Sequence, residues 1–343
     1  MNPPGARRVG VVVAATLVAL AVAVLAGLAI GPTPIGVGRV LGDLLSRVGV
    51  GHSTLSPLQS TIIWQLRAPR MVLGLLAGAM LAVAGGTYQG VFRNPLADPY
   101  LLGVAAGAGL GATIAIVDIG GGVTTPGWTP LLAFVGALGA VALTWVVGGR
   151  GLRASAATLI LAGVAVASLL TSAQTYLQQS SSSSIARVYI WLLGSLATAS
   201  WHSVTLVVPY VAACVAICVA AGRALDVLSV GDDESRSLGL PVRRVRLLVV
   251  AASSLGTAAV VSVVGLIGFV GIIVPHIVRL LVGTSYRRIL PISVVFGAAF
   301  LVLADTIART IVAPSELPIG VVTALLGAPV FVAILSFRRP VLR

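Results

Sequence analysis

Residues 247–275 read LLVVAASSLGTAAVVSVVGLIGFVGIIVP, and no charged side chain interrupts them. A helix needs about 20 mainly apolar residues to cross the hydrocarbon core of a bilayer. One helix over the whole stretch would overshoot the membrane, so we expect two spanning helices with a break at Gly265. A run of this length and composition indicates that lipid, and not water, surrounds this part of the chain.

Apolar segments of spanning length recur along the whole chain, which has 343 residues. It is 58% hydrophobic and only 9% charged, whereas a soluble domain carries about 25% charged residues. The sequence therefore predicts an all-α polytopic membrane protein in which residues 1–343 form a single domain. Ten spans are expected, at 9–30, 71–92, 101–117, 130–149, 155–178, 203–222, 245–264, 266–283, 290–308 and 319–337.

Two segments need a choice of interpretation. Arg7 and Arg8 precede the first apolar run, as the charged region of a signal peptide would. That run, 9–30, is long enough to span, so we expect a retained first helix. Residues 180–200 begin with serines and continue with an apolar segment too short to span. We expect a half-helix there, lying at the extracytoplasmic interface with its tryptophans at headgroup depth.

All 22 basic residues are arginine, and the chain contains no lysine. Because a P-loop needs a lysine on the β- and γ-phosphates of ATP, the chain is not a Walker-type ATPase by itself. With both termini inside, ten spans leave 16 of the arginines in cytoplasmic segments, as the positive-inside rule requires. The net charge of +13 thus reflects topology and not a nucleic-acid surface. The six arginines expected outside are Arg39, Arg47, Arg67, Arg70, Arg187 and Arg309.

Side chains for catalysis or metal binding are sparse. The three histidines, His52, His202 and His276, lie far apart in the sequence and on different helix ends. Cys214 and Cys218 stand within an apolar run, where we expect small buried side chains. No acid–base or metal cluster follows from this distribution, so we predict neither a catalytic residue nor a metal site.

Asp305 is an acidic residue expected near the outer end of the ninth span, four residues before Arg309. This spacing allows an ion pair on one helix face. A proton or sodium pathway would need several acids at depth, and the predicted spans lack them. An ion-coupled secondary transporter of a small solute stays open as the less favoured alternative.

The most hydrophilic segment is 231–241, which reads GDDESRSLGLP and holds three of the nine acidic residues. A short helix would end at Gly239, and Pro241 would open the next one. On the predicted topology this segment is cytoplasmic. It is either a solvated loop or a short helix that a soluble motor protein grips.

A series of short motifs runs from about residue 60 to the C-terminus. The motifs are RAPR at 67–70, YQG at 88–90, NPLADP at 94–99, LG at 102–103, LGLP at 238–241, GFVG at 268–271, VPHIVR at 274–279, AD at 304–305, ELPIG at 316–320 and GAPVF at 327–331. In their order and spacing they resemble the FecCD family. Members of that family are membrane permeases of ABC importers for iron–siderophore complexes, haem and vitamin B12.

The resemblance implies the architecture of a type II ABC importer permease, with ten helices, in a bacterial cytoplasmic membrane. The expected partners are a second permease subunit of identical sequence, two ATP-binding subunits and an extracytoplasmic solute-binding protein. ATP and Mg are then bound by the ATP-binding subunits, and this chain holds no cofactor. The expected cargo is a metal chelate such as a ferric siderophore, with haem and cobalamin as further candidates, and alternating access is driven by the ATPase.

The resemblance also implies roles for individual residues. A coupling helix within 229–240 would contact the ATPase, although acidic residues stand at 233 and 234 where relatives commonly have smaller ones. Arg67 and Arg70 could instead be interfacial anchors, and Arg309 could instead pair with Asp305. The implied sets are Gly231, Asp233, Glu234, Arg236, Leu238 and Gly239 for ATPase coupling; Arg67, Arg70 and Arg309 for docking of the binding protein; Gln174, Tyr176 and Gln178 for the translocation path; and Ser155, Ala156 and Ala157 for the inner gate.

Overall fold

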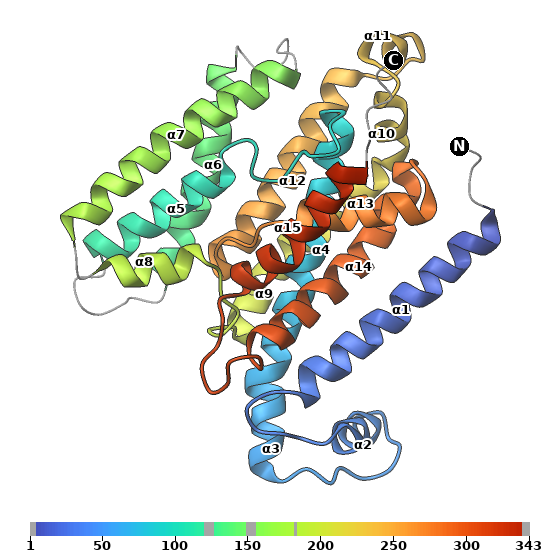
Figure 1. Ribbon diagram of the computed structural model, residues 1–343, viewed down its shortest axis with the longest axis vertical. Helices are drawn as coiled ribbons and strands as arrows, with labels where there is room; N and C mark the ends of the chain where they lie inside the picture. The colour runs from blue at the N-terminus through green and yellow to red at the C-terminus, as the bar shows by residue number, and fades with distance from the viewer. Residues whose placement is uncertain (1–4, 120–126, 149–155, 182–183, 338–343) are drawn as a thin grey trace.

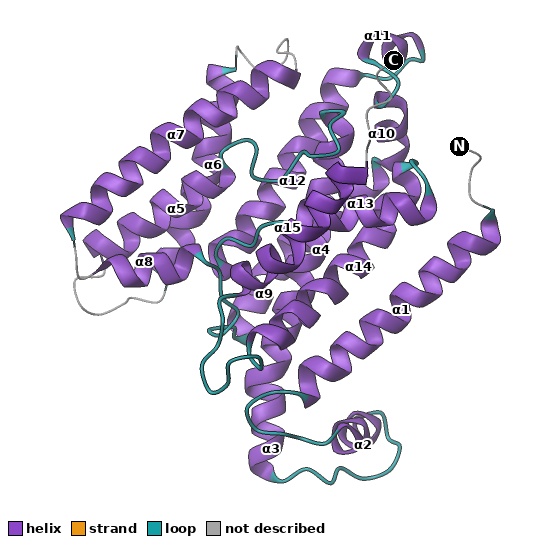
Figure 2. Cartoon of the chain, in the orientation of Figure 1, coloured by secondary structure: helices purple, strands orange, loops and turns teal. Residues whose placement is uncertain are grey.

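The computed structural model describes residues 5–119, 127–148, 156–181 and 184–337, and this part of the chain consists of helices and loops without a strand (Figures 1 and 2). Each of the ten predicted spans coincides with a helix. Over the residues whose side chains are described, seven of these helices are long and apolar enough to cross a bilayer. The ten are α1 (Ala6–Ala29), α4 (Ala68–Val91), α5 (Val104–Ile114), α6 (Trp128–Val147), α7 (Ala156–Ser180), α9 (Trp201–Ala220), α12 (Val242–Val264), α13 (Val270–Val282), α14 (Tyr286–Ala308) and α15 (Ile319–Phe337).

Shorter elements connect or extend these helices. One of them, α8, occupies part of the predicted half-helix region at 180–200; its depth in the membrane stays a prediction. The short elements are α2 (Val37–Arg47), α3 (Pro57–Thr61), η1 (Ile62–Arg67), η2 (Ala115–Ile119), α8 (Ile185–Leu192), α10 (Gly222–Leu228) and α11 (Asp232–Ser237).

The break predicted at Gly265 separates α12 from α13. Gly265 has a φ of +73°, and a Cβ atom at this position would lie 2.2 Å from the carbonyl oxygen of Trp191. Both observations require glycine, because any other residue would be strained and would collide with α8. The chain then runs without helix to Phe269, and α13 begins at Val270.

The α4 helix is the centre of the bundle and packs against α9, α12, α13 and α14. In its most apolar window 78% of the residues are buried within the protein, against 11% for α1. Since α1 is no less apolar, its exposed face is the one that lipid covers. Between helices in lipid, association depends on close packing more than on the hydrophobic effect, and small residues permit it.

Glycines bring the α4 backbone into contact with two neighbours. A Cβ atom on Gly85 would lie 1.9 Å from the carbonyl oxygen of Gly271 in α13. A Cβ atom on Gly78 would lie 2.1 Å from the carbonyl oxygen of Gly297 in α14. Glycine at these two positions therefore permits the close packing of α4 against α13 and α14.

A second group of helices, α5, α6 and α7, lies beside this centre, to the left in Figure 1, and contacts it chiefly through α12. Here too glycine sets the distance between helices. A Cβ atom on Gly107 would lie 2.2 Å from the carbonyl oxygen of Gly136, and one on Gly111 would lie 2.0 Å from that of Leu132. These contacts hold α5 against α6.

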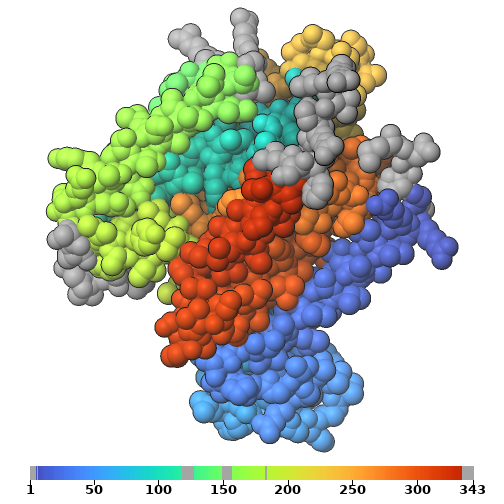
Figure 3. All heavy atoms as spheres, in the orientation of Figure 1, coloured from blue at the N-terminus to red at the C-terminus, as the bar shows by residue number. Residues whose placement is uncertain are grey.

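The protruding elements α2 and α3 were not predicted from the sequence (Figure 3, blue, bottom). The helical segment Pro57–Val91 has 35 residues, which at 1.5 Å per residue is about 52 Å long and exceeds a hydrocarbon core of about 30 Å. Its start at α3 therefore projects beyond the bundle. Ser56 and Gln59 form a capping box at this start.

Asp43 fixes α2 against the projecting helix. Its carboxylate accepts hydrogen bonds from Ser53 Oγ at 2.7 Å, Trp64 Nε1 at 2.9 Å and Arg47 Nε at 3.1 Å. Burial by itself raises the pKa of Asp43, but these three donors outweigh it, and the pKa lies below its ordinary value. The search for spans missed α2 because a helix of 11 residues is too short to cross a membrane.

The two ends of the bundle differ in what they carry. The α11 end, at the top of Figure 1, holds the start of α1, the end of α4, α10, α11 and the start of α12. The α2 end holds α2, α3, and the end of α14. Among the described residues, the α11 end carries arginines that are expected in the cytoplasm: Arg93, Arg223, Arg236, Arg243, Arg244 and Arg246. The α2 end carries arginines that are expected outside: Arg39, Arg47, Arg67, Arg70 and Arg309. Which end faces the cytoplasm stays a prediction of the positive-inside rule.

We expect Gly85→Ala to destabilise the protein, because the added Cβ atom would force α4 away from α13. Overpacking of this kind costs roughly 1–3 kcal/mol, and more where backbone must move. Gly139→Ala is the matched control, since no atom lies within 4 Å of its added Cβ. Thermal unfolding of the purified protein in detergent should show a clear loss for Gly85→Ala alone. Equal midpoints for the two variants would contradict the packing role of Gly85.

Candidate functional site

The α11 helix projects from its end of the bundle and presents three of the predicted coupling residues outward. Asp233, Arg236 and Leu238 have exposed side chains, and Leu238 is 70% exposed although it is apolar. Arg236 Nη1 and Asp233 Oδ1 form an ion pair of 2.6 Å within the helix. This face is therefore free of contacts with the rest of the described chain. Its exposed charged and apolar side chains are accessible to a partner protein.

Of the other three predicted coupling residues, Gly231 and Gly239 shape the turns around α11, and Glu234 lies within the helix. Gly231 and Gly239 have φ values of +137° and +81°, a region that favours glycine. A Cβ atom on Gly231 would lie 2.0 Å from Oε2 of Glu234, whose side chain is otherwise exposed. The six residues thus belong to one projecting turn–helix–turn, and their contact with an ATPase stays a prediction.

The inward face of α11 is formed by Asp232 and Ser235. Ser235 is fully buried, and its hydroxyl donates to the Val227 carbonyl oxygen at 2.8 Å. Asp232 forms ion pairs with Arg246 at 2.9 Å and with Arg93 at 3.3 Å. Sequence reasoning did not select Asp232, because Arg93 is remote in sequence and no local pattern pairs the two residues.

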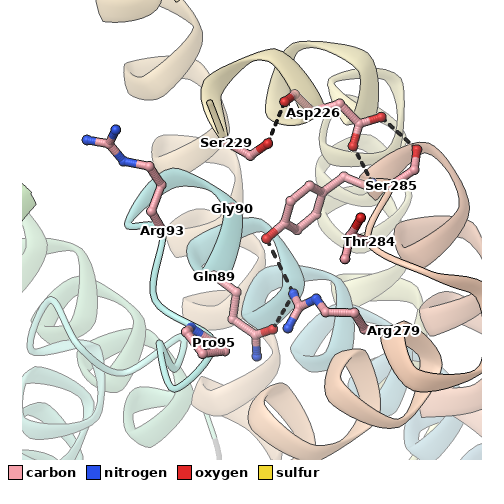
Figure 4. Close-up of a pocket in the computed structure, with 10 residues that line it drawn as sticks. Gln89, Gly90, Arg93, Pro95, Asp226, Ser229, Arg279, Thr284 and Ser285 are labelled. Atoms are coloured by element: carbon pink, nitrogen blue, oxygen red, sulfur yellow. Dashed lines mark hydrogen bonds between the residues drawn. The ribbon is translucent and has the colours of Figure 1, made fainter. Parts of the chain in front are cut away.

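A cavity of about 440 Å³ lies at the α11 end of the bundle, and residues of three predicted motifs, YQG, NPLADP and VPHIVR, line it (Figure 4). Arg279 Nη2 donates to Gln89 Oε1 at 2.9 Å and to the Tyr286 hydroxyl at 3.3 Å. Asp226 accepts from Ser285 Oγ at 2.7 Å and from the Tyr286 backbone N–H at 2.5 Å. These bonds join α13 to α4 and α10 to α14, so the motifs YQG and VPHIVR serve helix contacts at this end.

The motif NPLADP forms the turn that follows α4. The Asn94 side chain accepts from the Leu96 backbone N–H at 2.9 Å, and Asp98 accepts from that of Tyr100 at 2.8 Å. Side chains of this kind stabilise turns by replacing backbone acceptors. Burial raises the pKa of Asp98 to about 6, and the bond from Tyr100 offsets part of that rise. The role of this motif is therefore to build the connection to α5.

At the α2 end the structure brings together the three arginines predicted for docking. Arg70 grips Asp305 with two nitrogens, Nε to Oδ2 at 2.9 Å and Nη2 to Oδ1 at 2.8 Å. Its third nitrogen, Nη1, contacts Glu316 Oε1 at 3.0 Å. The near partner of Asp305 is thus Arg70, which lies 235 residues away in the sequence. The i,i+4 partner, Arg309, keeps its Nε atom 3.9 Å from Asp305.

Two of these arginines are buried inside the chain. Arg67 is only 5% exposed and donates to the carbonyl oxygens of Leu28 at 2.7 Å and Ala29 at 2.9 Å. Arg309 is 4% exposed and donates to the Gly27 carbonyl oxygen at 2.6 Å. Both therefore hold the end of α1 against the bundle. Docking of a partner through them would require that these bonds be broken or shared, and it stays a prediction.

The three path residues predicted on α7 do not share one face. Gln174 is 7% exposed and faces Gly109 of α5, while Tyr176 is 74% exposed and points away from the bundle. Gln178 is half-buried. Of the inner gate, Ser155 lies outside the described residues, only the helical backbone of Ala156 is described, and Ala157 is exposed. The roles of these six residues in a path or a gate stay predictions.

Metal-binding groups are dispersed in the described part of the chain. No group of three or more His, Cys, Asp or Glu side chains there could hold a metal ion. Cys214 and Cys218 are buried free thiols, and Cys218 lies 3.4 Å from Ser253 Oγ. The two cysteines are thus small buried side chains of α9, in the position that the sequence predicts.

The sequence and the fold both have known counterparts. The pattern of the FecCD transport family matches residues 18–337. The cobalamin import system permease BtuC of Halobacterium salinarum is 42% identical, over 81% of this chain and 74% of its own length. The hemin transport system permease HmuU of Yersinia pestis is 37% identical, over 81% of this chain and 84% of its own. A solved inward-facing structure of a metal-chelate type ABC transporter superimposes with a TM-score of 0.83 and 29% identity, over 94% of this chain and 98% of that one. The predicted fold class is thereby confirmed.

We expect Asp305→Asn to destabilise the α2 end strongly, because it leaves Arg70 and Arg309 without their buried counter-charge. Breaking a buried ion pair from one side typically costs about 3–5 kcal/mol. Glu316→Gln is the control: Glu316 is 33% exposed, and partly solvated pairs contribute about 1 kcal/mol or less. Thermal unfolding should show the larger loss for Asp305→Asn. A larger loss for Glu316→Gln would contradict the central place of Asp305.

Proposed function

This chain belongs to the FecCD transport family, and we propose that it is the permease subunit of an ATP-driven importer that carries a metal chelate by alternating access. The observation that carries the proposal is the outward face of α11, whose side chains at Asp233, Arg236 and Leu238 are exposed in the described chain. Because the chain has no lysine, it cannot form the P-loop that ATP hydrolysis requires. ATP and Mg are then bound by two separate ATP-binding subunits, which contact α11.

The cargo class follows from the relatives. One is named for cobalamin import, one for hemin transport, and the solved structure is of a metal-chelate type transporter. We propose that the cargo is a metal chelate, such as a ferric siderophore, haem or cobalamin. The exposed face of α7 suits the passage of a bulky cargo, because its side chains are uncharged. It carries Tyr176, and the hydroxyls of Ser168, Ser172 and Thr175 donate to carbonyl oxygens of α7 itself.

A second, identical permease subunit would complete the path, because the face of α7 that carries Tyr176 is exposed in the described part of the chain. In this arrangement the α11 end faces the cytoplasm of a bacterial cell, both termini lie there, and the α2 end faces outward. ATP binding would close the ATPase pair and shift α11, and that movement would open the path to the other side.

The α2 end is the proposed docking surface for an extracytoplasmic solute-binding protein. Three guanidinium groups stand there against two carboxylates, those of Asp305 and Glu316, so the cluster has an excess positive charge. Carboxylates of a partner would complement that charge, and such contacts chiefly set the rate and orientation of encounter. Arg70 already pairs with Asp305 and Glu316, so a partner carboxylate that competes for Arg70 would alter the contacts between α4 and these two residues.

The proposal is tested by transport in proteoliposomes that contain this chain, its ATPase and its solute-binding protein. We expect ATP-dependent uptake of at least one of cyanocobalamin, hemin and a ferric siderophore, and none without the binding protein. Uptake that continues without the ATPase would support an ion-coupled secondary transporter instead.

In the same assay we expect Arg236→Glu to lower uptake by roughly tenfold or more, because a reversed charge at a protein interface is repelled by its former partner. Arg236 is exposed, so the change should leave the fold intact. Arg7→Glu, an equal charge reversal at the exposed start of α1, is the control and should retain ATP-coupled uptake. Wild-type uptake by Arg236→Glu would remove Arg236 from the coupling surface.

A further inference from the structure

The α11 helix has only six residues, which is too short to be stable or to keep its orientation by itself. Its position must therefore be set by contacts with longer helices. If the outward face binds a partner, a movement of that partner can reach the helix bundle only through contacts of the inward face.

Among the described residues, Asp232 is the α11 side chain whose ion pairs reach beyond the helix. Both of its carboxylate oxygens lie 2.9 Å from Nη2 of Arg246, and Oδ1 also lies 3.3 Å from Nη2 of Arg93. The side chains of Asp232 and Arg246 are 27% and 14% exposed. The neighbouring pair, Asp233 with Arg236, is 92% and 63% exposed and stays within α11. Partly buried pairs are screened less by solvent than exposed ones, so the Asp232 contacts are the stronger.

The two arginines belong to the helices at the centre of the bundle. Arg93 follows the last turn of α4 and has a φ of +50°, a strained value for a residue other than glycine. Arg246 stands near the start of α12, which packs along α4 and α9. Asp232 thus connects α11 to two of the most buried helices at once. Without its charge, the two guanidinium groups would face each other with no acid between them.

The α4 helix extends this connection to the opposite end of the protein. The helical segment Pro57–Val91 is continuous, and Arg70 near its outer part binds Asp305 and Glu316. A displacement of α11 that pulls on Arg93 would therefore act on the same helix that carries the proposed docking cluster.

From these contacts we propose that Asp232 is the positioning residue of the coupling helix: its ion pairs with Arg93 and Arg246 latch α11 to α4 and α12 and transmit the movement of the ATPase. This inference rests on the proposed function and adds a residue to its coupling machinery. Asp232 does not touch the partner in this scheme. It acts through the two arginines.

The test is the Asp232→Asn variant in the complete complex in proteoliposomes. Asp226→Asn in α10 is the matched control, because Asp226 accepts hydrogen bonds from neutral donors, Ser285 Oγ and the Tyr286 backbone N–H, and belongs to neither proposed partner surface. Each variant removes one negative charge and keeps the side-chain size. We expect Asp232→Asn to retain ATP hydrolysis but to lower the uptake per ATP hydrolysed by at least tenfold. Asp226→Asn should stay within twofold of the wild type, and Asp232→Glu should recover part of the loss. Equal behaviour of the two asparagine variants would overturn the latch.

A second measurement keeps the proposal testable if Asp232→Asn assembles poorly. The double variant Arg93→Gln with Arg246→Gln removes the partners without altering α11, and it should show the same loss of coupling. Backbone hydrogen exchange should be faster in α11 of both variants and unchanged in α11 of Asp226→Asn. Unchanged exchange in the Asp232→Asn and double variants would overturn the latch whether or not uptake is measured. Absence of ATP-driven uptake in the wild-type complex would instead overturn the proposed function.

Discussion

Inside a bilayer the lipid tails are as apolar as the side chains of a helix, so helices associate through close contact more than through exclusion of water. In this protein the contact is made by the backbone of α4. Its glycines at 78 and 85 place it directly against carbonyl oxygens of α14 and α13. A methyl group at either position would have no room. Because α9, α12, α13 and α14 all pack on α4, the arrangement of the central helices depends on these two close approaches.

The same helix carries polar contacts at both of its ends. Near the α11 end, Gln89 binds Arg279, and Arg93 after its last turn binds Asp232. Near the α2 end, Arg70 binds Asp305 and Glu316. Ion pairs are costly at the centre of a membrane and are tolerated at its edges. Because these ion pairs lie near the two ends, close packing holds the apolar middle of the bundle together. The charged side chains lie at the two surfaces where soluble partners would bind. A rigid helix between two such clusters is a direct physical route from one surface to the other.

Much of the fold follows from the sequence because the bilayer imposes length and polarity on each helix. The ten spans were predicted from apolar length, and the break at Gly265 from the excess length of residues 247–275. The α2 helix was missed because it crosses nothing, and its stability comes from Asp43, Trp64 and Arg47, whose contact requires the folded chain. The candidate site was predictable in part. The projecting segment was recognised from its polarity and its glycines, whereas Asp232 was not, since its partners lie on other helices.

The sequence by itself determined that the chain is a polytopic membrane protein with about ten apolar helices, that it lacks the lysine of a Walker-type P-loop, and that a polar segment stands between the sixth and seventh of these helices. These conclusions depend only on composition and order. The tertiary structure decided which charges meet. It paired Asp305 with Arg70 and not with the closer Arg309, and it directed Arg67 and Arg309 to carbonyl oxygens of the α1 segment. The physical reason is that a buried charge takes the partner that the packing of helices brings within hydrogen-bond distance, and sequence separation does not enter that choice.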